Sequence, residues 1–99
     1  MKLDVVFRPE AAADVISARR WYENQQAGLG RRFTRSLSET IIRIQDMPRM
    51  YVVALENVRR AKLRTFPYLL YYRVLEDRVE ILGVLHGSRQ PNVWQERIS

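Results

Sequence analysis

The chain has 99 residues, of which 46% are hydrophobic, so it has the length of one domain and enough apolar side chains for one core. With no cysteine and a single histidine, it can form neither a disulfide framework nor a thiolate or histidine-rich metal site, and we expect no metal and no cofactor. Seventeen Lys and Arg against eleven Asp and Glu give a formal net charge of +6. Such a charge predicts an acidic partner, either nucleic acid or an acidic protein segment.

The distribution of apolar residues predicts a protein without a membrane segment. No run approaches the roughly 20 apolar residues that cross a bilayer. Asp4 and Arg8 interrupt what would be the apolar core of a signal peptide. We therefore expect a cytoplasmic protein with one domain over residues 1–99 and no membrane partner.

The N-terminal half predicts a strand and two helices. Apolar and polar side chains mostly alternate over residues 2–8, which is the period of a strand with one buried face. Apolar residues then recur at helical spacing from about Pro9 to Gln26 and again from Arg31 to Met47. Pro48 cannot continue the second helix, and the two glycines of residues 27–30 supply a tight turn between the helices. This pattern predicts an antiparallel helical hairpin.

The C-terminal half is rich in β-branched and aromatic residues and predicts mostly sheet. Strands are expected over Val58–Thr65, Pro67–Leu75 and Val79–His86, and the last of these, apolar on both faces, should be central. A loop over Gly87–Asn92 and a short helix within Val93–Ile98 complete the chain. The fold class is therefore α+β, with an N-terminal strand, an antiparallel two-helix hairpin packed on one face of a C-terminal antiparallel sheet, and a short C-terminal helix.

The apolar positions that share the inward phase of these elements predict the core. They are Phe33, Leu37, Ile41, Ile44, Leu63, Tyr72, Ile81 and Val84. On the first C-terminal strand the opposite phase is basic, because Arg60, Lys62 and Arg64 alternate with Ala61 and Leu63.

A series of short motifs carries a resemblance to a known family. In the C-terminal half they are Val58-Arg59-Arg60, Phe66-Pro67-Tyr68, Tyr72-Arg73-Val74, the run from Val84 to Arg89, Pro91 and Trp94. Ala13-Asp14, Trp21-Tyr22 and Phe33 accompany them in the N-terminal half. In this order and spacing the chain resembles the RelE/ParE toxins of type II toxin–antitoxin systems, which include plasmid-stabilisation proteins. The resemblance implies a toxin that a labile cognate antitoxin neutralises by wrapping around it.

The family resemblance implies one of two targets. One branch cuts messenger RNA in the ribosome, and it needs cations to hold the scissile phosphate and groups that move protons. If this chain is such a nuclease, its candidate catalytic residues are Arg60, Lys62, Arg73, His86 and Arg89. His86 could act as acid or base near neutrality, or it could simply form a hydrogen bond at the end of a strand.

The other branch poisons DNA gyrase and needs a binding surface. Two departures favour this branch, because Leu69 stands where the cleaving branch places an arginine, and Trp94 stands where that branch carries a tyrosine. The ending Val84-Leu85-His86, followed by a small residue, also resembles the gyrase branch. Gyrase poisoning is therefore the favoured function, ribosome-dependent cleavage is the alternative, and a basic interaction module of low toxicity is a third. Whether the protein is an enzyme stays open.

The basic residues also predict where a partner binds. No acidic residue occurs between Glu56 and Glu76, so positive charge is concentrated there. An acidic antitoxin segment, or the target, is expected to bind at Arg59, Arg60, Lys62, Arg64, Arg73, Arg89 and Trp94. Arg31 and Arg32, which flank the helical turn, are expected to be merely solvated.

Overall fold

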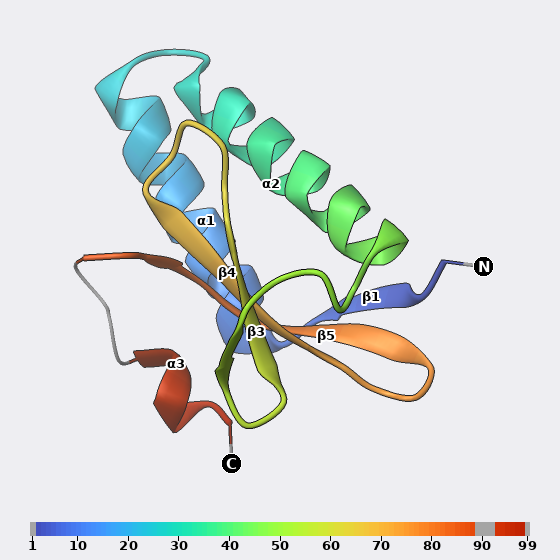
Figure 1. Ribbon diagram of the computed structural model, residues 1–99. Helices are drawn as coiled ribbons and strands as arrows, with labels where there is room; N and C mark the ends of the chain where they lie inside the picture. The colour runs from blue at the N-terminus through green and yellow to red at the C-terminus, as the bar shows by residue number, and fades with distance from the viewer. Residues whose placement is uncertain (1, 89–92, 99) are drawn as a thin grey trace.

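The computed structural model describes residues 2–88 and 93–98 and has the α+β class that the sequence predicts (Figure 1). In chain order the elements are β1 (Asp4–Phe7), α1 (Pro9–Gln25), α2 (Leu29–Asp46), β2 (Val53–Leu55), β3 (Val58–Lys62), β4 (Tyr68–Val74), β5 (Arg78–His86) and α3 (Val93–Glu96). The two long helices and three of the C-terminal strands lie where they were predicted, while the short strand β2 was not predicted.

The strands form one five-stranded sheet in the order β1-β5-β4-β3-β2. Neighbouring strands from β2 to β5 are antiparallel, but β1 pairs parallel with β5, from Asp4 opposite Arg78 to Phe7 opposite Ile81. The N-terminal strand thus joins the C-terminal sheet, which is mixed and not purely antiparallel. β5 is an interior strand, as its apolar faces predicted.

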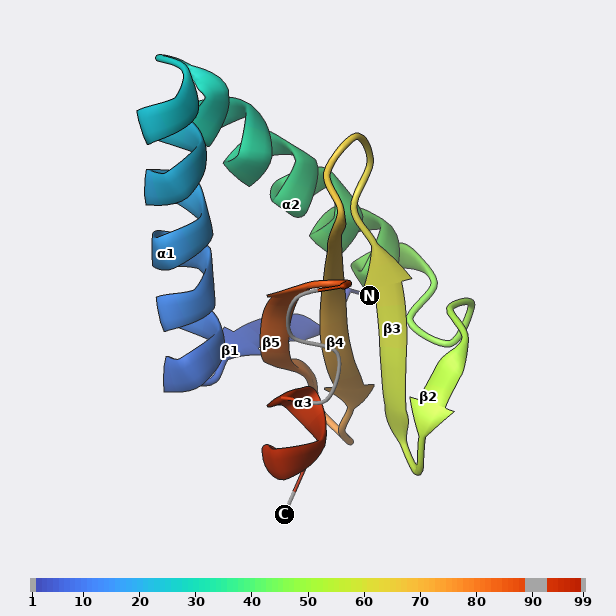
Figure 2. The same ribbon diagram turned by 90° about the vertical axis from the view of Figure 1, so that its left-hand side faces the viewer.

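The two faces of the sheet are covered by different elements (Figure 2). Helices α1 and α2 pack on one face, which we call the helix face, and α3 lies on the other, which we call the α3 face. Seven of the eight predicted core residues are buried on the helix face, and Ile41 is partly buried beside them. The smaller core of the α3 face consists of Val58, Tyr71, Leu82, Leu85 and Trp94.

A bulge in β5 changes which of its apolar residues share a face of the sheet. Tyr71 lies opposite Gly83 and Tyr72 opposite Ile81, so Leu82 is an extra residue in the ladder. Beyond the bulge the alternation is shifted by one residue. Ile81 and Val84 therefore both pack in the core of the helix face, although they are three residues apart.

An ion pair between Asp14 of α1 and Arg97, just after α3, satisfies the backbone groups beside this bulge. Asp14 Oδ2 accepts the N–H of Val84 at 3.0 Å, and Arg97 Nη1 donates to the carbonyl of Leu82 at 3.1 Å and to Asp14 Oδ2 at 2.7 Å. The side chains are only 13% and 15% exposed. The hydrogen bond from Asp14 raises the pKa of Arg97 above its ordinary value. A Cβ at Gly83 would lie 2.9 Å from Arg97 Nη1, so glycine leaves room for this pair.

Helix α2 begins at Leu29, two residues before the predicted start at Arg31, and the turn before it is held by Glu23. Gly28 adopts φ +90°, and the Glu23 carboxylate accepts the backbone N–H of Gly28 and of Gly30, each at 3.0 Å. These bonds satisfy N–H groups that a helix start otherwise leaves open, and they lower the pKa of Glu23. A Cβ at Gly30 would lie 2.9 Å from the Arg19 carbonyl oxygen, so glycine also allows the close approach of the two helices.

Breaking the Asp14–Arg97 pair is expected to destabilise the fold. Asp14→Ala and Arg97→Ala should each lower the free energy of unfolding by about 3 kcal/mol, because each leaves a largely buried partner without its counter-charge. The double variant should lose less than the sum of the two, with a coupling of at least about 1 kcal/mol in a urea-unfolding double-mutant cycle. Strictly additive losses would show that the two side chains do not depend on each other.

The helix turn should make stability depend on pH in the acid range. Since the folded-state pKa of Glu23 is lowered, its carboxylate stabilises the fold above the unfolded-state pKa, and this contribution is lost as the pH falls through the folded-state pKa. Glu23→Gln should therefore be less stable than wild type in neutral buffer and equally stable in strongly acidic buffer, as measured by urea unfolding. The control is Glu76→Gln, a substitution at an exposed residue elsewhere. Its difference in stability from wild type should not change between neutral and strongly acidic buffer.

Candidate functional site

The basic residues predicted on β3 and β4 do not form one surface. Arg60 and Lys62 lie on the α3 face, opposite Tyr71 and Leu69 of β4, as the alternation predicted. Burial raises the pKa of Tyr71, and the adjacent Arg60 guanidinium opposes that rise. Lys62 Nζ donates to the carbonyl oxygens of Leu63 at 3.2 Å and Phe66 at 3.4 Å. Lys62 therefore holds the loop between β3 and β4, although its side chain remains exposed.

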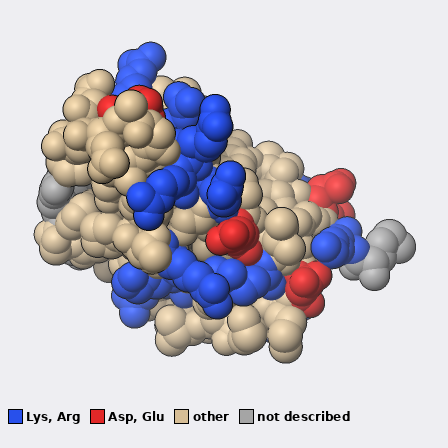
Figure 3. All heavy atoms as spheres, turned by 90° about the horizontal axis from the view of Figure 1, so that it is seen from above, with Lys and Arg blue, Asp and Glu red and all other residues tan. Residues whose placement is uncertain are grey.

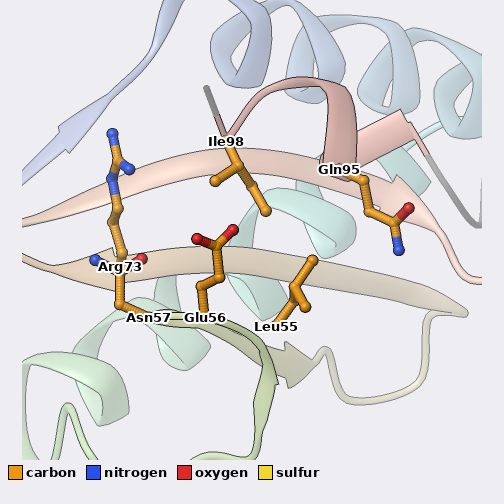
Figure 4. A pocket seen from close by; sticks show the side chains of 6 residues that line it. All are labelled: Leu55, Glu56, Asn57, Arg73, Gln95 and Ile98. Atoms are coloured by element: carbon orange, nitrogen blue, oxygen red, sulfur yellow. The ribbon is translucent and has the colours of Figure 1, made fainter.

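Arg73 also lies on the α3 face, and its charge is compensated. Its Nε donates to Glu80 Oε1 across the β4–β5 pair at 2.6 Å, and the two side chains are 22% and 17% exposed. Arg73 borders an open groove of about 700 Å³ lined also by Leu55, Glu56, Asn57, Gln95 and Ile98 (Figure 4). Figure 4 shows the Glu56 carboxylate within this groove. The lining offers polar contacts and a carboxylate but no imidazole.

Arg59 lies on the helix face, unlike Arg60. Its Nη1 donates to the backbone carbonyls of Tyr51 at 2.7 Å and Arg49 at 3.1 Å. The side chain therefore fixes the segment between α2 and β2. The prediction that Arg59 and Arg60 belong to one basic surface is wrong, because the two side chains lie on opposite faces of the sheet. Strand alternation alone already separates neighbouring residues onto opposite faces.

Trp94, which was predicted to bind the antitoxin or the target, is buried in the core of the α3 face. Its ring is stacked on Tyr71, with centroids 4.8 Å apart and an interplanar angle of 11°, and the residue is 5% exposed. It therefore anchors α3 on the sheet. The other C-terminal candidate, Arg89, lies outside the described residues.

His86 lies on the helix face, away from Arg60 and Lys62. It is opposite Tyr68 in the β4–β5 register, and the two rings meet edge to face with centroids 5.4 Å apart. Tyr68 in turn packs against Phe33 of α2. His86 Nδ1 accepts the backbone N–H of Ser88 at 3.2 Å. The sheet thus separates the predicted acid–base residue from the predicted cations of β3.

A second basic cluster was missed because its members are far apart in the sequence. Arg64, in the loop after β3, lies beside Arg32 and Arg35 of α2, and together with Ser36, Glu39, Thr65 and Phe66 they line a pocket of about 210 Å³. Figure 3 shows basic side chains gathered over the end of the molecule that carries the α1–α2 turn and the β3–β4 loop. The spacing of Arg32 and Arg35, three residues apart in one helix, was the available signal.

Residues 2–88 and 93–98 contain neither a candidate metal site nor a candidate membrane-spanning helix. No group of three His, Cys, Asp or Glu side chains in these ranges could hold a metal ion. None of the helices in these ranges is long and apolar enough to cross a membrane.

Two solved structures share this architecture. The chromosomal ParDE toxin–antitoxin system from P. aeruginosa matches 86% of this chain and 96% of its own chain, with a TM-score of 0.75 and 17% identity. A double mutant of the E. coli toxin RelE in the free state matches 99% of this chain and 96% of its own, with a TM-score of 0.62 and 16% identity. At such low identities these matches establish a common fold alone.

Sequence comparison identifies the branch. Toxin ParE2 from two strains of Mycobacterium tuberculosis is 33% identical over 57 residues, which are 58% of this chain and 54% of the relative. The chain therefore spans about half the length of the curated relatives it matches. The family model for the ParE toxin of the type II toxin–antitoxin system parDE matches residues 5–91. With nearly the whole chain matched, this protein belongs to the ParE toxin family.

Proposed function

We propose that this protein is the toxin of a type II toxin–antitoxin pair, that a cognate antitoxin neutralises it, and that it inhibits growth by poisoning DNA gyrase in the cytoplasm. Membership of the ParE family supports the toxin role. The gyrase target rests on the residues of the chain itself, since a shared fold can serve either mechanism.

The separation of His86 from the basic residues of β3 is the observation that carries this proposal. Cleavage of RNA needs a proton-transfer group and phosphate-binding cations around one scissile bond. Here His86 packs on Tyr68 on the helix face, whereas Arg60 and Lys62 lie on the α3 face. Such an arrangement suits a protein that acts by binding.

Two of the cationic candidates are also engaged by groups of the protein itself. Arg73 is paired with Glu80 at 2.6 Å, and Lys62 donates to two loop carbonyls. Trp94, at the place where the cleaving branch carries a tyrosine, is buried against Tyr71. Indole has no oxygen-bound proton to transfer.

Ribosome-dependent messenger cleavage remains the second candidate function, because the fold also matches the toxin RelE. Arg60 and Lys62 lie on one face, which is the arrangement that a phosphate contact needs. A basic interaction module of low toxicity is the third candidate, and it would leave growth unaffected.

The test compares the two targets directly. On induction without antitoxin we expect growth arrest with a DNA-damage response, and the purified protein should inhibit gyrase supercoiling while leaving messenger RNA intact in a translating extract. His86→Gln should keep growth inhibition largely intact, because His86 serves packing here. Lys62→Gln, a substitution on the α3 face, is the variant to be compared with His86→Gln on the helix face.

Two outcomes would contradict the proposal. Messenger cleavage that disappears in a folded His86→Gln variant would establish the nuclease and give His86 a catalytic role. Normal growth on induction of the wild-type protein, with the folded protein present, would favour the low-toxicity module. Circular dichroism and urea midpoints serve as the folding controls for both variants.

A further inference from the structure

Helix α2 and the β3–β4 loop bring three arginines together around one pocket. Arg32 and Arg35 come from α2, and Arg64 comes from the loop about thirty residues later, on a pocket of about 210 Å³. All three side chains belong to exposed residues. This cluster is therefore accessible to a partner.

The loop that carries Arg64 is held in place from several sides. Ser36 Oγ of α2 donates to the Arg64 carbonyl at 2.8 Å, and Lys62 Nζ donates to the carbonyls of Leu63 and Phe66. The Phe66 ring is 6% exposed and packs edge to face on Phe33 of α2, with centroids 5.3 Å apart. These contacts fix the loop relative to α2, so the backbone positions of the three arginines are held together before a partner binds.

None of the three guanidinium groups forms an ion pair within the described part of the chain, although Glu39 lines the same pocket. Arg8, Arg73, Arg78 and Arg97 each have a carboxylate partner within 4 Å, whereas no such ion pair involves Arg32, Arg35 or Arg64 among residues 2–88 and 93–98. Gathering like charges costs free energy, and a bound anion would remove that cost.

We propose that Arg32, Arg35 and Arg64 form a binding site for the carboxylates of an acidic peptide segment supplied by the antitoxin. The inference rests on the proposed function for the identity of the partner. Arginine suits this role because its planar guanidinium can form two parallel hydrogen bonds with one carboxylate.

Two features favour an acidic peptide over a nucleic acid. Single-stranded nucleic acids are held by bases stacked on exposed aromatic rings. Phe66, the aromatic residue that lines this pocket, is 6% exposed, and Phe33 and Tyr22, which pack on it, are at most 9% exposed. Glu39 also lines the pocket, and it would repel any anion beside it, but a nucleic acid carries a phosphate at every step of its backbone whereas a peptide can place its carboxylates beside the arginines alone. A peptide can place a basic or polar residue opposite Glu39.

The surface of α2 extends the site beyond the pocket. Arg32, Arg35, Glu39 and Ile42 follow one another at spacings of three, four and three residues, so they lie along one face of the helix. Ile42 is 49% exposed. The segment should therefore place carboxylates against the arginines and an apolar residue against Ile42, in the manner of rim charges around an apolar anchor.

The experiment measures binding of the full chain to a labelled synthetic peptide of alternating glutamate and alanine in which one alanine is replaced by glutamine, the polar residue that can lie opposite Glu39, and to the protein encoded beside its gene. Arg32→Gln with Arg64→Gln should slow association roughly tenfold at low ionic strength and flatten its salt dependence. Arg20→Gln with Arg49→Gln removes the same charge at exposed positions elsewhere and should change association far less. Ile42→Ser should mainly hasten dissociation of the gene-encoded partner.

Competition and toxicity distinguish the possible failures. Identical salt slopes for wild type and the Arg32/Arg64 variant would overturn the site, as would an all-thymine oligonucleotide that displaces the peptide at lower concentration than unlabelled peptide does. If the wild-type protein is toxic and neutralised, but the Arg32/Arg64 variant is neutralised equally fast, the site is wrong and the toxin function stands. If the wild-type protein does not inhibit growth, the proposed function fails, while binding of the acidic peptide still reports on the site.

Discussion

The ion pair between Asp14 and Arg97 is the constraint on which the arrangement of this sheet depends. It joins α1 to the segment after α3, and both side chains bind backbone groups of β5 on either side of Gly83. Those groups lie beside the bulge, where the regular ladder is interrupted. Without such partners they would be costly to bury. A helix, an interior strand and the C-terminal segment therefore share one polar junction.

The bulge beside this junction decides which side chains reach each face. It turns Leu82 and Leu85 toward α3 and leaves Ile81 and Val84 in the main core. Across the ladder, Tyr71 stacks with Trp94, while Tyr72 is buried among the helices and donates its hydroxyl proton to the Pro48 carbonyl at 2.7 Å. Burial raises the pKa of Tyr72 to about 12, so the hydroxyl remains a donor even in moderately alkaline solution.

The same two-faced sheet distributes the positive charge of the chain. Arg59 and Arg73 are engaged by backbone carbonyls or a carboxylate, and they contribute to packing more than to an external field. Arg32, Arg35 and Arg64, around the β3–β4 loop, have no such partners among the described residues, so their charge is available to another molecule at the end of the protein that Figure 3 shows. A rigid framework with a localised charged surface suits a protein that acts and is controlled through binding.

The sequence by itself determined the helices, the main strands, most of the core and the family. Each of these leaves a local periodic pattern or a short motif, as in the alternation of Ala61 and Leu63 with Arg60 and Lys62. Tertiary structure decided the parallel pairing of β1 with β5, the bulge at Leu82, the burial of Trp94 and the meeting of Arg64 with Arg32 and Arg35. These features join segments that are distant in the chain. The sequence around a basic residue does not indicate whether its side chain will bind a distant carbonyl, a distant carboxylate or a partner protein. Local patterns report the face that a residue takes within its own element, whereas its neighbours across the fold are fixed only when the elements pack.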